Sequence, residues 1–169
     1  PELGRSTLDQ LIIGAGPGGY IAAIRAAQLG MKVACVDDGS RADGRPAPGG
    51  TCTNVGCIPS KALLQSSEHF EHAGHAFAEH GIEVKGLGLD VARMLARKDK
   101  VVAQNNDGIL HLFKKNEVAF FHGTGSFAGP RGDGGWPIAV AAPAPAAATA
   151  LTAKHVIVAT GSKPRPLPG

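Results

Sequence analysis

The sequence predicts an α/β fold in which helices cover a parallel sheet and a small antiparallel β-meander extends it. Three observations support this fold class. A short apolar strand near residue 10 is followed by a glycine-rich turn, an alanine-rich helix and a second apolar strand. A long helical pattern covers residues 91–115. After residue 117 the pattern changes to short strands separated by turns.

The elements are expected in a simple order within one domain. Residues 1–9 are mostly polar and carry no pattern, so we expect a tail there and a domain over 10–169. The first helix should end at Gly30, because glycine commonly follows a helix C-terminus. The expected strands are 10–13, 31–36, 118–121, 126–127, 136–142, 150–153 and 154–159, and the expected helices are 20–29, 57–79 and 91–115. Residues 123–125 are expected to form a turn.

The glycine turn matches a dinucleotide fingerprint. Gly14, Gly16 and Gly19 satisfy G-x-G-x-x-G between a predicted strand and a predicted helix. The roles of these glycines would be a tight turn, close approach to a pyrophosphate, and helix–strand packing. Asp37 follows the second strand, 18 positions after Gly19. This sequence separation is close to that at which a carboxylate accepts hydrogen bonds from an adenosine ribose. A Rossmann-like nucleotide site is therefore predicted.

A pair of cysteines begins the next predicted helix. Cys52 and Cys57 lie five residues apart in the segment 49–61, GGTCTNVGCIPSK. A helix N-terminus carries a partial positive charge that favours thiolate over thiol, and Cys57 is the better placed of the two. A disulfide across so short a loop gains little by cross-linking the unfolded chain, so the pair indicates redox chemistry.

Composition and charge exclude several other functions. The net charge of +3 comes without a basic run, which gives nucleic-acid binding little support. No apolar run has the length of a membrane span, and a cytoplasmic location is expected. Zinc would want four ligands, and the three cysteines offer one close pair, so no metal is expected. Cys35, in the middle of a strand, is expected to be a small core residue.

Two further sets of polar residues are expected to face solvent. The charges of the turn-rich loop 39–48, from Arg41, Asp43 and Arg45, are expected to be solvated, with the alternative that one arginine contacts a phosphate. Four histidines have spacings of three, three and five, which do not stack them on one helical face. We expect these histidines, His69, His72, His75 and His80, to form a solvated surface.

With these residues in hand, the chain resembles the pyridine nucleotide–disulfide oxidoreductase family, in its branch that oxidises dihydrolipoamide. The most specific segment is GGTCTNVGCIPSKALL, where Thr53 stands at a position more usually leucine. Glutathione, trypanothione and mercuric reductases share the two cysteines, but the residues after Cys57 tend to differ in them. Further matching segments are GAGPGGYIAAIRAAQLG, LFKKN, GTGSF and VIVATGSKPRPLPG.

The resemblance implies FAD as the bound nucleotide and residues 10–169 as the N-terminal part of its domain. Asp37 stands where a glutamate is more usual, one methylene longer. The implied contacts are Gly14, Gly16 and Gly19 with the pyrophosphate, Asp37 with the ribose, Gly50 and Thr51 with the phosphate region, Gly125 with the adenine end, Thr160 and Gly161 with the dinucleotide, and Lys61 with the flavin ring. A cation at Lys61 would stabilise an anionic reduced flavin.

The reaction implied by the resemblance is a two-electron relay. Dihydrolipoamide, carried on a lipoyl domain of a 2-oxo acid dehydrogenase complex, attacks the disulfide at Cys52, and Cys57 passes the electrons to FAD and then NAD⁺. In the family the general base is a histidine from the partner subunit of a homodimer. The sequence holds neither a histidine in a matching motif nor a second G-x-G-x-x-G for NAD. We expect the NAD and interface domains to lie outside it, flavin affinity to be weak or lacking, and turnover to be absent.

Other functions stay open at this stage. The chain could be a stand-alone flavin- or nucleotide-binding module without turnover. It could also be a thiol redox sensor that uses Cys52 and Cys57 without FAD, or belong to a glutathione- or mercuric-type reductase. Flavin absorption bands and their response to a dithiol separate these functions.

Overall fold

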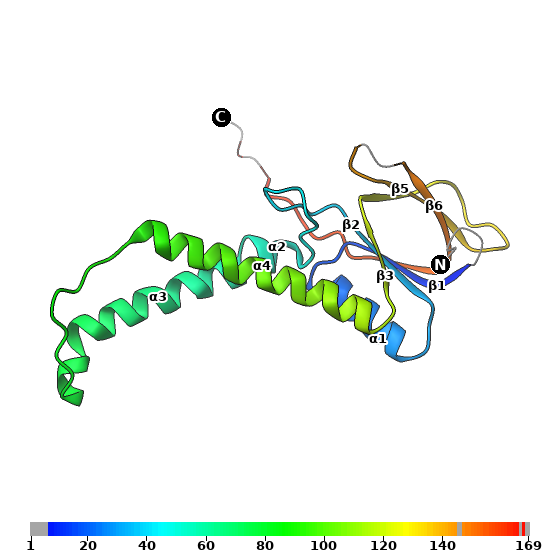
Figure 1. The fold of residues 1–169 in the computed structure, drawn as a ribbon. Helices are drawn as coiled ribbons and strands as arrows, with labels where there is room; N and C mark the ends of the chain where they lie inside the picture. Colours follow the sequence, from blue (N-terminus) through cyan, green and yellow to red (C-terminus); the bar gives the residue numbers. More distant parts are fainter. Residues whose placement is uncertain (1–6, 145–146, 166, 168–169) are drawn as a thin grey trace.

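A computed structural model of the chain describes residues 7–144, 147–165 and 167. Its strands join in one sheet with the order β3-β2-β1-β6-β5-β4 (Figure 1). The strands are β1 (Leu8–Ile13), β2 (Val33–Asp37), β3 (Ala119–His122), β4 (Thr124–Phe127), β5 (Trp136–Ala141) and β6 (Thr149–Val158). The helices are α1 (Pro17–Gln28), α2 (Gly50–Asn54), α3 (Cys57–His75) and α4 (Val91–Lys115), with a 3₁₀ turn, η2 (Phe77–His80).

The centre of the sheet is parallel, as the sequence predicted. β1 pairs in parallel with β2 and with β6, and β2 pairs in parallel with β3. β1 begins at Leu8 rather than at residue 10, because Leu8 is buried and pairs with Ala153 of β6. Of the expected tail, Thr7 is exposed and lies outside any strand, and residues 1–6 lie outside the described residues.

The last strand differs from the prediction. We expected separate strands over 150–153 and 154–159, but β6 runs without a break from Thr149 to Val158. Its first half pairs antiparallel with β5, and its second half pairs in parallel with β1. Since Ala153 pairs with both Trp136 and Leu8, one strand belongs to the meander and to the parallel sheet at once.

The predicted turn at 123–125 is wrong in extent. Only Gly123 makes the bend, and Thr124 already pairs with Ala141 as the first residue of β4. Gly123 donates its N–H to the carbonyl of Asp37 at 2.9 Å. A Cβ at this position would lie 2.4 Å from the carbonyl oxygen of Ala141, so the sharp bend requires glycine.

The helices α3 and α4 run side by side and project beyond the sheet (Figure 1). α3 ends at His75 and is followed by η2, so the single helix expected to residue 79 is interrupted. α4 has the predicted bounds and is capped by the preceding Asp90, whose side chain accepts the N–H of Arg93 at 3.0 Å. Among the described residues, no helix has the length and hydrophobicity needed to cross a membrane.

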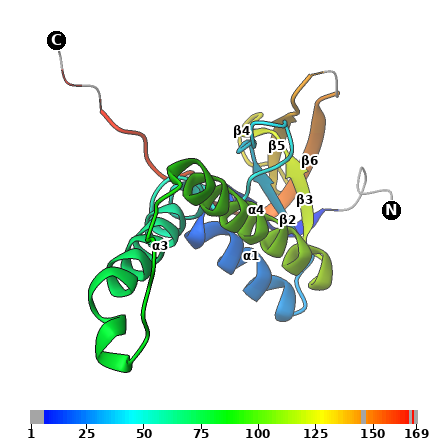
Figure 2. The ribbon, with the colours of Figure 1, turned by 60° about the vertical axis from the view of Figure 1, so that its left-hand side comes forward.

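Two hydrophobic clusters lie on opposite faces of the sheet, so the molecule has three layers (Figure 2). On one face, Leu11 and Ile13 of β1 pack with Ile138 of β5 beneath the meander. On the other face, Ile12 packs with Phe113 of α4 and with residues of α1. The alternation along β1 follows the two-residue period of a strand. The parallel strands are thereby held between the helices and the meander.

Candidate functional site

The glycine turn is held by close backbone contacts. Gly14 has a φ of +103°, and a Cβ there would lie 2.3 Å from the carbonyl oxygen of Ala159, which follows β6. A Cβ at Gly19 would lie 1.8 Å from the carbonyl oxygen of Gly14. These distances leave no room for a side chain at either position. The turn therefore lies against the carboxyl end of β6 while α1 packs onto β1.

A cavity opens at the N-terminus of α1. Its volume is about 400 Å³. The predicted residues that line it are Gly14, Gly16, Asp37, Gly50, Thr51, Cys52, Thr160 and Gly161. Because the first N–H groups of a helix have no intrahelical partner and carry a partial positive charge, this end of α1 is suited to bind phosphate.

A second cavity of about 250 Å³ continues from the first. The two share Gly14, Asp37 and Thr160, and the second adds Gly125 of β4. The structure therefore brings together most of the residues expected at a dinucleotide. Gly19 is buried beneath the turn and lines neither cavity.

The carboxylate of Asp37 connects two backbone segments. Its Oδ2 accepts the N–H of Ala15 in the glycine turn at 2.7 Å, and its Oδ1 accepts the N–H of Gly39 at 3.0 Å. Each carboxylate oxygen can accept more than one hydrogen bond, so these contacts do not exhaust the side chain. Asp37 thus shapes the turn, and it also lines both cavities.

The loop before α2 lies against the glycine turn. Gly49 donates its N–H to the carbonyl of Ala15 at 2.7 Å. Gly50 has a φ of +60°, and a Cβ there would lie 2.7 Å from the Cα of Gly16. This close approach needs glycine at 50 and carries the start of α2 to the edge of the first cavity.

Cys52 and Cys57 are joined by a disulfide, with their Cα atoms 4.7 Å apart. Cys52 is half-buried in α2 and lines the first cavity. Cys57 is exposed and is the first residue of α3, the position from which the helix N-terminus favours its thiolate. The disulfide and the glycine turn therefore border the same cavity through Cys52.

Lys61 lies apart from the two cavities. It is exposed on α3 and lines another cavity, which Arg97 and Val101 of α4 also line. Residues four apart share a helix face, so Lys61 lies on the same side of α3 as Cys57. The expected approach of Lys61 to a flavin stays a prediction.

The histidines on α3 and η2 are exposed. Within the part of the chain that the structure describes, no three His, Cys, Asp or Glu side chains are grouped so as to hold a metal ion.

The expectation that Arg41 is solvated is wrong. Its side chain is only 11% exposed, and Nη2 donates to the carbonyl of Ala103 at 3.1 Å and pairs with Asp107. The loop that follows β2 is thus attached to α4. Arg45, by contrast, is exposed and pairs with Asp43 at 2.7 Å.

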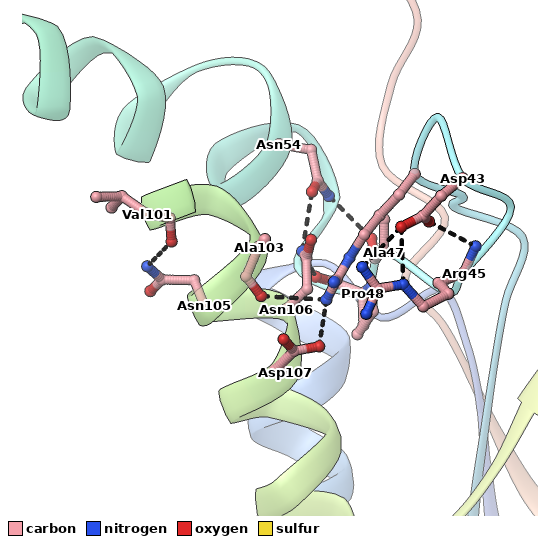
Figure 3. Close-up of polar contacts among 11 residues, drawn as sticks. Asp43, Arg45, Ala47, Pro48, Asn54, Val101, Ala103, Asn105, Asn106 and Asp107 are labelled. Carbon is pink, nitrogen blue, oxygen red and sulfur yellow. Dashed lines mark hydrogen bonds and ion pairs between the residues drawn. The ribbon is translucent and has the colours of Figure 1, made fainter. Parts of the chain in front are cut away.

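Two asparagines near the site were not identified from the sequence. Asn106 of α4 is fully buried, and it hydrogen-bonds to Asn54 of α2 at 2.9 Å (Figure 3). The one available signal was spacing, since Asn106 falls three and seven residues before the buried Ile109 and Phe113. An amide inside an apolar stripe indicates a buried polar partner.

Cys35 behaves as the sequence predicted. It is buried in β2 and is the one free cysteine among the described residues. Burial raises the pKa of its thiol to about 12, and the charge of nearby Asp37 acts in the same direction. A thiol with so high a pKa is a poor nucleophile at neutral pH.

Comparisons with known proteins agree with this geometry. The family model for pyridine nucleotide-disulphide oxidoreductases matches residues 8–169. A dihydrolipoyl dehydrogenase of Cupriavidus necator is 53% identical over 163 residues, and the mitochondrial one of Pisum sativum is 48% identical over 161. A leghemoglobin reductase of Vigna unguiculata is 46% identical over 167 residues. Each comparison covers 95% of this chain but only 33%, 30% and 28% of the relative, so the chain spans about a third of their length.

Alanine substitution at two neighbouring glycines should destabilise the fold at the buried position and not at the open one. Gly19→Ala should lower the free energy of unfolding by about 3 kcal/mol, because the new methyl group meets the carbonyl of Gly14. Gly18→Ala should leave it within about 1 kcal/mol of wild type, since no atom lies within 4 Å of a Cβ there. Urea denaturation followed by circular dichroism measures both. Equal losses in the two variants would contradict the described packing.

Cys35 should resist alkylation in the folded protein. With iodoacetamide at about pH 8.5, mass spectrometry should find Cys35 unmodified in buffer and modified in urea. Because folding raises the pKa of this thiol above its usual 9.0, the thiol stabilises the fold below about pH 9, and this contribution is lost as the pH rises toward 12. Modification at the same rate in buffer and in urea would show that the thiol is not buried.

Proposed function

Because the chain belongs to the pyridine nucleotide-disulphide oxidoreductase family, we propose that it forms the FAD-binding part of an enzyme that oxidises dihydrolipoamide. One observation carries the proposal. Cys52, half of a disulfide, lines the same cavity as the glycine turn. A reducible pair beside a dinucleotide cradle is suited to pass electrons between a thiol substrate and a flavin.

The residues present fit FAD. The N-terminus of α1 and the close approach of Gly50 to Gly16 make a cradle suited to a pyrophosphate. Asp37 and Gly125 line the adjoining cavity, where the ribose and the adenine end would be bound. The pyrophosphate cradle would be completed by Thr51, Thr160 and Gly161, which line the first cavity. FAD, when bound, supplies a two-electron acceptor that passes hydride to NAD⁺.

The disulfide performs the thiol chemistry. A thiolate of the dithiol substrate attacks the sulfur of Cys52, forming a mixed disulfide and releasing Cys57 as a thiolate. The N-terminus of α3 stabilises that thiolate. The second substrate thiolate then attacks the mixed disulfide, which closes the substrate disulfide and leaves both cysteines reduced. The substrate loses two electrons and the cysteine pair gains them. Lys61, one turn after Cys57, would supply a positive charge beside the reduced flavin.

The names of the relatives support the proposed substrate and partners. Two of them are named dihydrolipoyl dehydrogenase, from which we propose dihydrolipoamide on a lipoyl domain of a 2-oxo acid dehydrogenase complex as the substrate. NAD as the final acceptor and a homodimeric assembly are proposed on the same basis. Since the 169 residues span about a third of those relatives, we expect them not to turn over by themselves.

Flavin binding tests the proposal. The chain should bind added FAD weakly, so its quenching of the flavin fluorescence should be measured with the chain in large excess. Gly16→Ala should raise the dissociation constant at least about tenfold, because its methyl group would occupy the phosphate cradle. A Cβ at Gly16 lies 3.8 Å from its nearest neighbour, so the fold should tolerate this change. Gly108→Ala, on the exposed part of α4 with open space around it, is the control and should bind as wild type.

Three outcomes would separate the remaining functions. A long-wavelength absorption band on adding a dithiol to the flavin-loaded chain would support the proposed enzyme. Bound flavin without a thiol response would support a nucleotide-binding module. Reversible oxidation of Cys52 and Cys57 with no FAD binding would instead support a thiol redox sensor and overturn the proposal.

A further inference from the structure

A buried amide of α4 reaches the loop that carries the redox pair. Asn106 is 0% exposed, and its Nδ2 donates to the carbonyl of Pro48 at 2.7 Å and to Oδ1 of Asn54 at 2.9 Å (Figure 3). Its own Oδ1 has no partner among the described residues. The orientation of the side chain is therefore set by its donor group.

Asn54 extends this contact toward the disulfide. It is the last residue of α2, two positions after Cys52. Its Nδ2 donates to the carbonyl of Ala47 at 2.9 Å and to the carbonyl of Gly50 at 3.0 Å. The two amides together satisfy the carbonyls of Ala47, Pro48 and Gly50. We call this pair, Asn106 and Asn54, the amide relay.

We propose that Asn106 is a positioning residue for the Cys52–Cys57 disulfide, acting through Asn54. The inference deepens the proposed function and rests on it, because it concerns the same redox pair. The hydrogen bonds of Asn106 go to Pro48 and Asn54 and not to either cysteine. It acts by holding the loop from which α2 begins.

The relay binds carbonyls of the loop, whereas the loop's N–H groups are bound elsewhere: Ala47 donates to the carbonyl of Gly39 at 2.8 Å and Gly49 to that of Ala15 at 2.7 Å. A buried carbonyl without a partner is costly, and the segment 47–49 lies in no helix or strand that could supply one. Gly49 and Gly50 must also keep their close contacts with Ala15 and Gly16. If the amides were lost, the buried carbonyls would gain by moving toward water, and the loop and α2 would open together.

The core fixes the other end of the relay. Ile109 and Phe113 lie on the same face of α4 as Asn106 and pack in the cluster that covers the sheet. Asn106 is therefore held by a rigid helix, while the loop it holds lacks regular structure. The position of Cys52 relative to the glycine turn follows from the packing of α4.

Hydrogen exchange and disulfide reduction test the relay on the 169-residue chain without flavin. Asn106→Ala should speed amide exchange in residues 47–54 and the reduction of the disulfide by dithiothreitol, each by about tenfold, as expected for the loss of one or two buried hydrogen bonds. Exchange in β1 and β2 should stay within about twofold of wild type. Asn105→Ala is the matched control, since Asn105 is the exposed neighbour and, among the described residues, its side chain hydrogen-bonds within its own helix, to the carbonyl of Val101 at 2.9 Å.

A second variant guards against loss of folding. Asn54→Ala removes the other half of the relay while Asn106 keeps its bond to Pro48. It should produce the same local rise in exchange and in the reduction rate. If Asn106→Ala does not fold, this variant tests the inference. A uniform rise in exchange over the whole chain, or rates equal to those of Asn105→Ala, would overturn the inference. FAD takes no part in these measurements, so a failure to bind FAD would count against the proposed function and not against the relay.

Discussion

The contact between the loop at Gly50 and the glycine turn at Gly16 is the constraint on which the site depends. Gly50 has no room for a side chain, because a single added carbon there would lie 2.7 Å from the Cα of Gly16. The contact places α2, with Cys52, beside the N-terminus of α1. The disulfide and the glycine turn proposed to hold the nucleotide, encoded more than thirty residues apart, thereby share one cavity.

Features that depend on local chain chemistry could be predicted from the sequence. The close contact of Gly19 with the carbonyl of Gly14 follows from the order of strand, turn and helix, which leaves no space for a side chain at Gly19. The position of Asp37 at the end of β2 and that of Cys57 at the start of α3 follow in the same way. Each depends on neighbouring residues in one or two elements, and the pattern of those elements is strong.

Features that depend on distant partners could not be predicted. Loop composition indicated a solvated Arg41, but Ala103 and Asp107 of α4 bind its guanidinium from more than sixty residues away. β6 is a single strand because β5 and β1 pair with its two halves, and no local signal joins them. Asn106 lies in a helix that was correctly predicted, yet its role follows from a loop 58 residues earlier.

The central claim is that the disulfide faces the nucleotide cradle, and a crystal structure of the chain with FAD bound would test it most directly. The account predicts the pyrophosphate at the N-terminus of α1 and the flavin ring in van der Waals contact, at about 4 Å, with a sulfur of the redox pair. A flavin ring bound elsewhere, with both sulfurs remote from it, would contradict the account.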